Sequence, residues 1–361
     1  MRHPALLTAV LLCSFACKAS KSDRAPAANS EPEPAPSVES GESGESGESG
    51  EADARVSPPK ALGELAIKLA DEVDRARYQA NLTFIAAERP PGSDHWQAVQ
   101  DRCAESLERS GFAVTRVTAK RAGTSVVGRK PGRNPQLPAI VVGAHYDHIP
   151  NCAGADDNAS GTAAVLELAH VLGSHAWDHT LYVACWDEEE TGRNGSRHWA
   201  DQAIAKGQAI ELYLNFDAMA YADHTPNSQT VPLGVDLIFA KQFAALKARQ
   251  YRADFIAILA DGAAHQPCQL YRAHAARLDL PTALIEIPTV LINEPMLADL
   301  RRSDHASFWK HEIPAMFLSD TASFRTDTYH CEGRPDTVDT LDIEFAVKVT
   351  QAAVGMLAEL L

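Results

Sequence analysis

Basic residues are scarce in this chain. It has 33 lysines and arginines against 48 aspartates and glutamates, which gives a formal net charge of -15. A nucleic-acid partner needs a basic face that neutralises phosphates. The charge balance therefore argues against nucleic-acid binding. Part of the acidity lies in residues 18–58, which hold nine acids and four bases.

The start of the chain has only a short apolar run. Ala5–Phe15 spans 11 residues after a basic start, too few for a helix that crosses a bilayer. We interpret residues 1–17 as an export signal. Ala16-Cys17 is similar to the lipoprotein processing site of bacteria, which would leave Cys17 lipidated. We expect export from a bacterial cell and attachment to the envelope only through this lipid. Simple secretion, a periplasmic location or an uncleaved anchor are the alternatives.

Residues 18–58 lack the apolar side chains that a packed core requires. Pro, Glu, Ser, Gly and Ala dominate, and Gly41–Glu51 repeats the triplet Gly-Glu-Ser. This composition predicts a disordered, self-repelling tether. The folded domain is therefore expected to cover residues 59–361.

Cysteines are few, and five remain after Cys17. In an oxidising compartment we expect one or two disulfides and at least one free thiol. Cys331 adjoins a predicted metal ligand and Cys152 lies in the loop between two others, so this pair is the first candidate. Cys185 lies in an apolar strand and is predicted to be a buried free thiol.

Strand and helix patterns alternate along the domain. This alternation predicts an α/β fold with a largely parallel sheet, in which ligands bind at the carboxyl ends of the strands. Ser160 is the expected N-cap of a helix that continues to residue 172. The other predicted helices are 62–79, 96–110, 196–206 and 236–252, and the predicted strands are 112–117, 125–126, 139–144, 181–186 and 210–216.

Several metal-ligand side chains follow the predicted strands. His145 and Asp147 are two residues apart at a strand end, so both point to the same side, and Asp147 can orient the imidazole. Asp157 follows in a glycine-flanked loop, where its two oxygens can bridge two cations. Its neighbour Asp156 is predicted to be a solvent-facing loop acid.

Acids also follow the next two strands. Glu188–Glu190 come after the strand that ends at Trp186, where one carboxylate can hold a cation and its neighbour can accept a proton. Asp217 ends a further strand, and His330 supplies a second imidazole. Two histidines and three carboxylates suit zinc, with manganese or cobalt as possible substitutes.

These motifs, in this order, resemble the aminopeptidase S / aminopeptidase Y family of co-catalytic zinc exopeptidases. Glutamate carboxypeptidase II and the glutaminyl cyclases are its distant members. The resemblance covers roughly Ala61–Leu361 and rests on five motifs at compatible spacing. It implies a three-layer α/β/α sandwich around a largely parallel mixed sheet, with two zinc ions per chain.

The resemblance also implies a role for each metal ligand. His145 and Asp217 would bind one zinc ion, and Asp157 would bridge both. Glu190 and His330 would bind the other zinc ion.

The catalytic roles follow in the same way. Glu189 would be the general base, because it matches the first acid of the family's EE-x-G-x-x-G-S motif. Tyr329 would stabilise the oxyanion. Ser303-Asp304-His305 resembles a motif that lies near the substrate, although a structural hydrogen-bond network beneath the site is an equal reading. The zinc ions would share the attacking water or hydroxide, and Glu189 would remove a proton from the water.

The expected substrate is a peptide, and the expected reaction is release of its N-terminal residue. A carboxypeptidase or dipeptidase is an alternative, for which Arg193, Arg301 and Arg302 are candidate cations, although Arg301 and Arg302 more simply form a surface pair. Glutaminyl cyclisation on the same scaffold is a second alternative. A non-catalytic binding protein is the third, but no predicted ligand or base is missing from this chain.

Overall fold

The computed structural model describes residues 62–119, 123–231 and 239–361. The predicted export signal and the predicted tether at 18–58 lie outside these residues, so they remain predictions, as does the domain boundary at residue 59. Among the described helices, none combines the length and apolarity that a membrane crossing requires.

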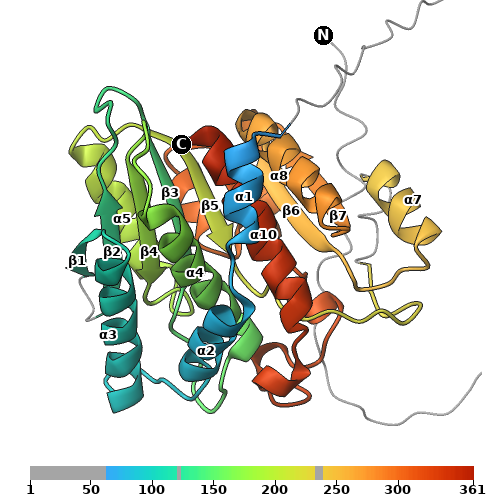
Figure 1. The fold of residues 1–361 in the computed structure, drawn as a ribbon. Helices are drawn as coiled ribbons and strands as arrows, with labels where there is room; N and C mark the ends of the chain where they lie inside the picture. Colours follow the sequence, from blue (N-terminus) through green and yellow to red (C-terminus); the bar gives the residue numbers. More distant parts are fainter. Residues whose placement is uncertain (1–61, 120–122, 232–238) are drawn as a thin grey trace, which may run out of the picture. The chain divides into compact units, whose positions relative to one another are not determined.

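A mixed sheet of eight strands forms the centre of the domain (Figure 1). Its spatial order is β1-β2-β4-β3-β5-β8-β6-β7. Strands β4, β3, β5 and β8 run parallel, β1–β2, β2–β4 and β8–β6 are antiparallel, and β6–β7 is parallel. The strands are β1 (Ala113–Thr118), β2 (Thr124–Lys130), β3 (Ala139–His145), β4 (Leu181–Trp186), β5 (Ile210–Phe216), β6 (Ile256–Asp261), β7 (Thr282–Ile287) and β8 (Ala315–Ser319).

Helices cover both faces of the sheet, which confirms the expected three-layer α/β/α sandwich. Helices α2, α3, α4, α8 and α10 lie on one face, with α1 packed on α10, whereas α5 and α9 lie on the other (Figure 1). The helices are α1 (Glu64–Asp71), α2 (Arg75–Ile85), α3 (Asp94–Arg109), α4 (Gly161–Gly173), α5 (Asn194–Ala205), α7 (Ala240–Ala248), α8 (His265–Arg277), α9 (His305–Trp309) and α10 (Ile343–Leu360).

The central strands are apolar on both faces because both faces are covered. In β4, Leu181 and Val183 face the core beneath α4 and α10, while Ala184 and Trp186 face the core beneath α5 and α9. The polar residues that follow β3, β4 and β5 therefore emerge together at the carboxyl edge of the sheet.

Two helix predictions need correction. The predicted helix 62–79 is two helices, because α1 ends at Asp71 and the side chain of Asp74 caps α2 by accepting the N–H of Arg77 at 2.6 Å. Ser160 does not cap α4 with its side chain. Asn158 provides this bond instead, since its Oδ1 accepts the N–H of Gly161 at 3.0 Å.

The second half of the chain was predicted less completely. The predicted helix 236–252 corresponds to α7 (Ala240–Ala248), and its first residues lie outside the described ranges. Strands β6, β7 and β8 and helices α8 and α10 have no counterpart in the sequence-based prediction. The structure adds short turns η1 (Ala155–Ser160), η2 (Gly262–Ala264), η3 (Thr289–Leu291), η4 (Pro295–Arg301), η5 (Ala322–Phe324), η6 (Tyr329–Cys331) and η7 (Val338–Thr340).

Two disulfides are present among the described residues. Cys152–Cys331 confirms the first predicted pair. The prediction for Cys185 was wrong, because Cys185 is bonded to Cys103, which places α3 against β4. Cys268 is a buried free thiol. Burial raises its pKa to about 12, so it stays protonated.

Candidate metal centre

His145 and Asp147 leave the end of β3 as a fixed pair. Both are buried, and the Nδ1 atom of His145 lies 3.2 Å from the carbonyl oxygen of Asp147 and 3.5 Å from its carboxylate. The Asp147 carboxylate accepts the backbone N–H groups of Glu189 and Glu190 at 3.1 and 3.2 Å. Asp147 therefore holds one side of the imidazole and ties the loop after β4 to the end of β3. This geometry suits the predicted orienting role.

The other imidazole nitrogen points at two acids. Nε2 of His145 lies 3.3 Å from Oδ1 of Asp157 and 3.6 Å from Oδ1 of Asp217, which follows β5. One ligand atom from each of these three residues falls within 4.8 Å of the others. The structure thus brings the predicted ligands of the first zinc ion together.

A second group forms on the opposite side of Asp157. Its Oδ2 atom lies 3.1 Å from Nε2 of His330, which in turn lies 3.5 Å from Oε2 of Glu190. His148 joins this group, because its Nδ1 atom lies 3.1 Å from Oε1 of Glu190. Asp157 is common to both groups, as a bridging carboxylate would be.

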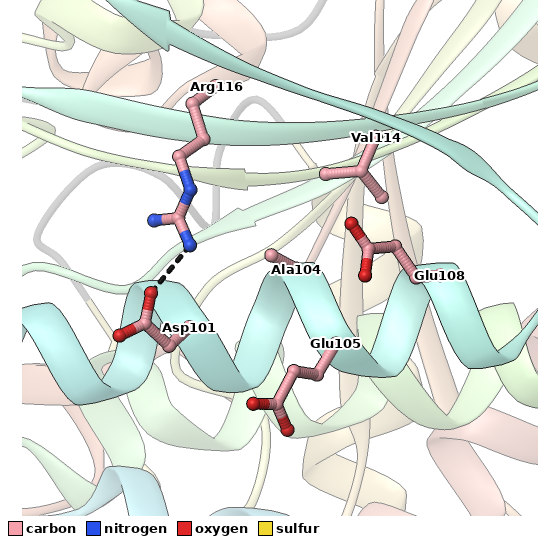
Figure 2. A pocket seen from close by; sticks show the side chains of 6 residues that line it. All are labelled: Asp101, Ala104, Glu105, Glu108, Val114 and Arg116. Carbon is pink, nitrogen blue, oxygen red and sulfur yellow. Dashed lines mark hydrogen bonds and ion pairs between the residues drawn. The ribbon is translucent and has the colours of Figure 1, made fainter.

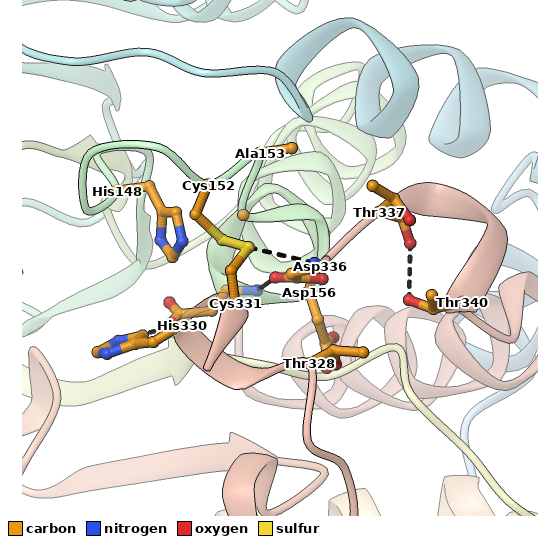
Figure 3. Close-up of a disulfide and its surroundings, with 12 residues drawn as sticks. His148, Cys152, Ala153, Asp156, Thr328, His330, Cys331, Asp336, Thr337 and Thr340 are labelled. Atoms are coloured by element: carbon orange, nitrogen blue, oxygen red, sulfur yellow. Dashed lines mark hydrogen bonds and ion pairs between the residues drawn. A yellow bond between two sulfur atoms is a disulfide. The ribbon is translucent and has the colours of Figure 1, made fainter. Parts of the chain in front are cut away.

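The loop that carries Asp157 is held by residues that were not predicted. Asp336 accepts the backbone N–H groups of Asp156 and Asp157 at 2.9 to 3.1 Å. Figure 3 shows Asp336 beside Asp156. The prediction that Asp156 faces solvent was wrong, since it is 3% exposed and accepts the N–H of Ala220 at 2.8 Å. These partners lie far away in the sequence, so no local pattern marks them.

A buried arginine donates hydrogen bonds to the backbone of the same loop. Arg89 is 1% exposed and donates to the carbonyl oxygens of Tyr146, Ala153 and Gly154. Burial lowers its pKa to about 10, and nearby carboxylates oppose that shift. Arg89 therefore satisfies backbone carbonyl groups along the loop that separates β3 from Asp157.

The charges of the site depend on one another. Burial opposes a charge on His145, yet the carboxylates of Asp217, Asp147 and Asp157 raise its pKa well above the usual value. The pKa of His330 is raised in the same way, chiefly by Asp157. Despite burial, both histidines hold the pKa of Asp157 well below its ordinary range. The negative charge of the carboxylates therefore favours positive charge nearby. Bound divalent cations can supply that positive charge in place of protons on the histidines.

Glu189 lies half-buried beside this cluster. Burial raises the pKa of its carboxyl group well above the usual value, and the charge of Asp304 adds to this, while His145 opposes it. A carboxylate with a raised pKa is suited to accept and return a proton near neutral pH. The position and environment therefore fit the predicted role of a general base.

Tyr329 adjoins the second group. Its ring stacks on that of His330 with centroids 4.0 Å apart. Burial raises the pKa of its hydroxyl group above the ordinary value, which keeps it a proton donor. The hydroxyl makes no hydrogen bond to any residue within the described ranges and is thus available to a ligand.

The Ser303-Asp304-His305 segment lies beneath the site. Ser303 accepts a hydrogen bond from Asn215 at 2.7 Å, in a chain that continues to Tyr213 and Trp186. The ring of His305 lies 2.8 Å from the carbonyl oxygen of Leu300 and stacks on Phe317. Burial lowers the pKa of His305 to about 4, so it remains neutral. Burial raises the pKa of Asp304 to about 7. Ser303 and His305 thus match the structural reading of the motif.

A separate hollow lies between α3 and β1 (Figure 2). Its polar lining consists of Asp101, Glu105, Glu108 and Arg116, and Arg116 donates to Asp101 at 2.6 Å. No histidine or cysteine lines it, and β1 is an outermost strand. The hollow is therefore unrelated to the ligand groups after β3, β4 and β5.

Comparison with known proteins shows which family this part of the chain is similar to. Residues 125–261 match peptidase family M28. The match confirms the resemblance predicted from the motifs. It contains the predicted site residues after β3, β4 and β5, whereas Tyr329 and His330 lie beyond it.

Two curated relatives with similar sequence are YfbL and YwaD. Uncharacterized protein YfbL of Escherichia coli is 28% identical over 232 residues, which are 61% of this chain and 66% of that protein. Aminopeptidase YwaD of Bacillus subtilis is 38% identical over 117 residues, 31% of this chain and 26% of that protein. The chain thus covers less than two thirds of either relative. The family and the aminopeptidase name support a hydrolase.

Solved structures show the same fold. The Legionella pneumophila LapA aminopeptidase has a TM-score of 0.63 at 18% identity and covers 84% of this chain and 78% of its own. A glutaminyl cyclase of Porphyromonas gingivalis has a TM-score of 0.54 at 19% identity and covers 81% and 98%. The M28 fold likeness therefore extends to proteins of two different named activities.

Proposed function

We propose that this chain is an exported two-zinc aminopeptidase that releases N-terminal residues from peptides. The observation that carries the proposal is the position of Asp157 between two ligand groups. His145 and Asp217 would hold one ion with Asp157, and Glu190 and His330 would hold the other.

The donor atoms present fit such ions. Oδ1 of Asp157 and Oε1 of Glu190 are buried without a hydrogen-bond partner among the described residues. Buried polar atoms are normally bonded, so orphaned oxygens that face imidazole nitrogens suit a cation. When bound, the zinc ions would supply Lewis acidity and lower the pKa of a water molecule.

The protein groups would carry out the proton transfers. Glu189 would accept a proton from the attacking water and return it to the leaving amine. Tyr329 would donate a hydrogen bond from its hydroxyl group to the carbonyl oxygen as negative charge develops there, and would keep its proton. Asp147 would keep His145 in the tautomer that leaves Nε2 free.

Export has support of its own. Two disulfides are typical of a chain that folds outside the reducing cytosol. One relative is named Probable lipoprotein aminopeptidase LpqL, from Mycobacterium tuberculosis. We infer that Cys17 is lipidated and that residues 18–58 tether the domain to the envelope.

Two alternatives stay open on this scaffold. The cyclase is a fold neighbour, but two complete ligand groups favour a two-metal hydrolase. A carboxypeptidase needs a free cation for the substrate carboxylate. Arg193 and Arg301 are engaged, since they donate to the carbonyl oxygens of Arg301 and Ile292, respectively. Arg302 is exposed and remains the candidate of this kind.

The test is hydrolysis of aminoacyl nitroanilides by the purified full chain. We expect turnover of the free-amine substrates and none of their N-acetylated forms. A chelator should abolish this turnover, and added zinc should restore it. Turnover of neither set by a zinc-loaded chain would contradict the aminopeptidase and direct attention to the carboxypeptidase, dipeptidase and cyclase reactions.

A further inference from the structure

His148 is a buried polar residue whose ring nitrogens lack hydrogen-bond partners among the described residues. Its side chain is 0% exposed, and neither ring nitrogen has a hydrogen-bond partner among residues 62–119, 123–231 and 239–361. Buried polar groups in proteins are nearly always satisfied. An imidazole with two orphaned nitrogens therefore points to a missing ligand.

The ring faces the second ligand group. Nδ1 of His148 lies 3.1 Å from Oε1 of Glu190, and the other oxygen of Glu190 faces His330 at 3.5 Å. Each oxygen of this carboxylate therefore meets one imidazole. The contact to His148 lacks hydrogen-bond geometry, since both of its atoms remain unpartnered. Ligand atoms bound to one tetrahedral zinc ion at 2.0–2.1 Å lie about 3.3 Å apart, which matches these contacts.

The surrounding loop fixes the ring in place. Gly154 has φ +54°, and a Cβ atom on it would come within 2.5 Å of the ring of His148. Arg89 and the disulfide at Cys152 hold the same loop from either side. Figure 3 shows His148 and His330 next to this disulfide. The position of the ring is thus built into the loop rather than left to a mobile side chain.

We propose that His148 is a ligand of the second metal ion, together with Asp157, Glu190 and His330. This inference rests on the proposed two-zinc function and adds a ligand that the family resemblance does not assign.

The second site then has four protein ligands, two of them nitrogens. The first has His145 and two acids. Zinc favours imidazole nitrogen, so the second site is the tighter one, and the first keeps an open position.

The test compares zinc binding by the full chain and its variants. Metal-free protein is titrated with zinc against a chromogenic chelator, and cobalt(II) spectra report the coordination. His148→Phe fills the same space without a nitrogen. His198→Ala, on the partly exposed face of α5, is the matched control.

The wild type and His198→Ala should bind two zinc ions with unequal affinities. His148→Phe should weaken the tighter event at least ~10–100-fold, the range for lost metal-site partners, and change the cobalt spectrum. His148→Ala serves as the second variant, and thermal unfolding of the metal-free proteins confirms that each is folded. If a folded His148 variant binds both zinc ions with wild-type affinity and keeps the wild-type cobalt spectrum, the inference about His148 is wrong. The proposed two-zinc function would then still stand. A wild type that binds no zinc would overturn the proposed function as well.

Discussion

At the scale of single residues, the proposed metal ligands Glu190 and Asp157 and their neighbours are positioned by other carboxylates that bind their backbone. Asp147 accepts the N–H groups of Glu189 and Glu190, and Asp336 accepts those of Asp156 and Asp157. A hydrogen bond to a charged acceptor is among the stronger ones in proteins. The chain therefore fixes the backbone of its ligands as well as their side chains.

Replacing the proposed base separates catalysis from metal binding. Glu189→Gln keeps the size of the side chain but cannot accept a proton. We expect kcat to fall by ~10²–10⁴-fold with two zinc ions still bound, since general acid–base catalysis contributes about that factor. Steady-state kinetics and metal analysis on the same sample make the measurement. Glu188→Gln next to it is the control, and wild-type activity in Glu189→Gln would refute the assignment.

The candidate ligands could be proposed from the sequence, whereas the residues that support them could not. His145, Asp157 and Asp217 follow strands that the apolar pattern reveals, so the strand order brings them together. Asp336 and Asp157 are 179 positions apart, and no local pattern joins them. The misjudged Asp156 shows the same limit, because its burial depends on Ala220 and Asp336, which lie much later in the chain. His148 likewise has no distinguishing sequence pattern, because the lack of hydrogen-bond partners at its nitrogens is evident only in the folded chain.

At the scale of elements, continuous apolar runs predicted the central strands well. β4 and β5 have the predicted bounds, and β3 extends one residue further, to His145. The helix prediction at 62–79 failed at Asp74, which is a cap rather than a helix-interior residue. Asp342, which caps α10 with its side chain, is a residue type that marks helix starts in a sequence. Strands β6–β8 were not predicted.

The disulfide Cys152–Cys331 joins the two loops that carry the second ligand group. Cys152 lies between His148 and Asp157, and Cys331 follows His330, with Sγ accepting the N–H of Asp336 at 3.3 Å. We expect the double variant Cys152→Ala/Cys331→Ala to bind its second zinc ion ~10–100-fold more weakly, because the loop that presents His330 loses its clamp.

The other disulfide supplies the matched control for that measurement. Cys103→Ala/Cys185→Ala removes the link between α3 and β4 and leaves the Cys152–Cys331 bond in place. It should lower the unfolding temperature and leave zinc affinity near the wild-type value. Equal zinc affinity in both double variants would show that the clamp does not support the metal centre.

At the scale of the whole molecule, part of the excess of acidic residues is concentrated at the candidate metal centre. The net charge of -15 includes a dense group of buried carboxylates at the carboxyl edge of the sheet, where raised histidine pKa values reveal strong negative potential. Divalent cations would relieve this repulsion. The fold, with three layers and parallel central strands, places that charge where α/β sheets bind ligands.

The most direct test of the central claim is the number of zinc ions that activity requires. Zinc is titrated into the metal-free full chain while binding is followed by calorimetry and turnover by a free-amine aminoacyl nitroanilide. The account predicts two ions per chain, full activity with both bound, and weakening of both events by Asp157→Asn. Full activity with one ion, or an Asp157→Asn variant that still binds two ions with wild-type affinity, would contradict the bridged pair.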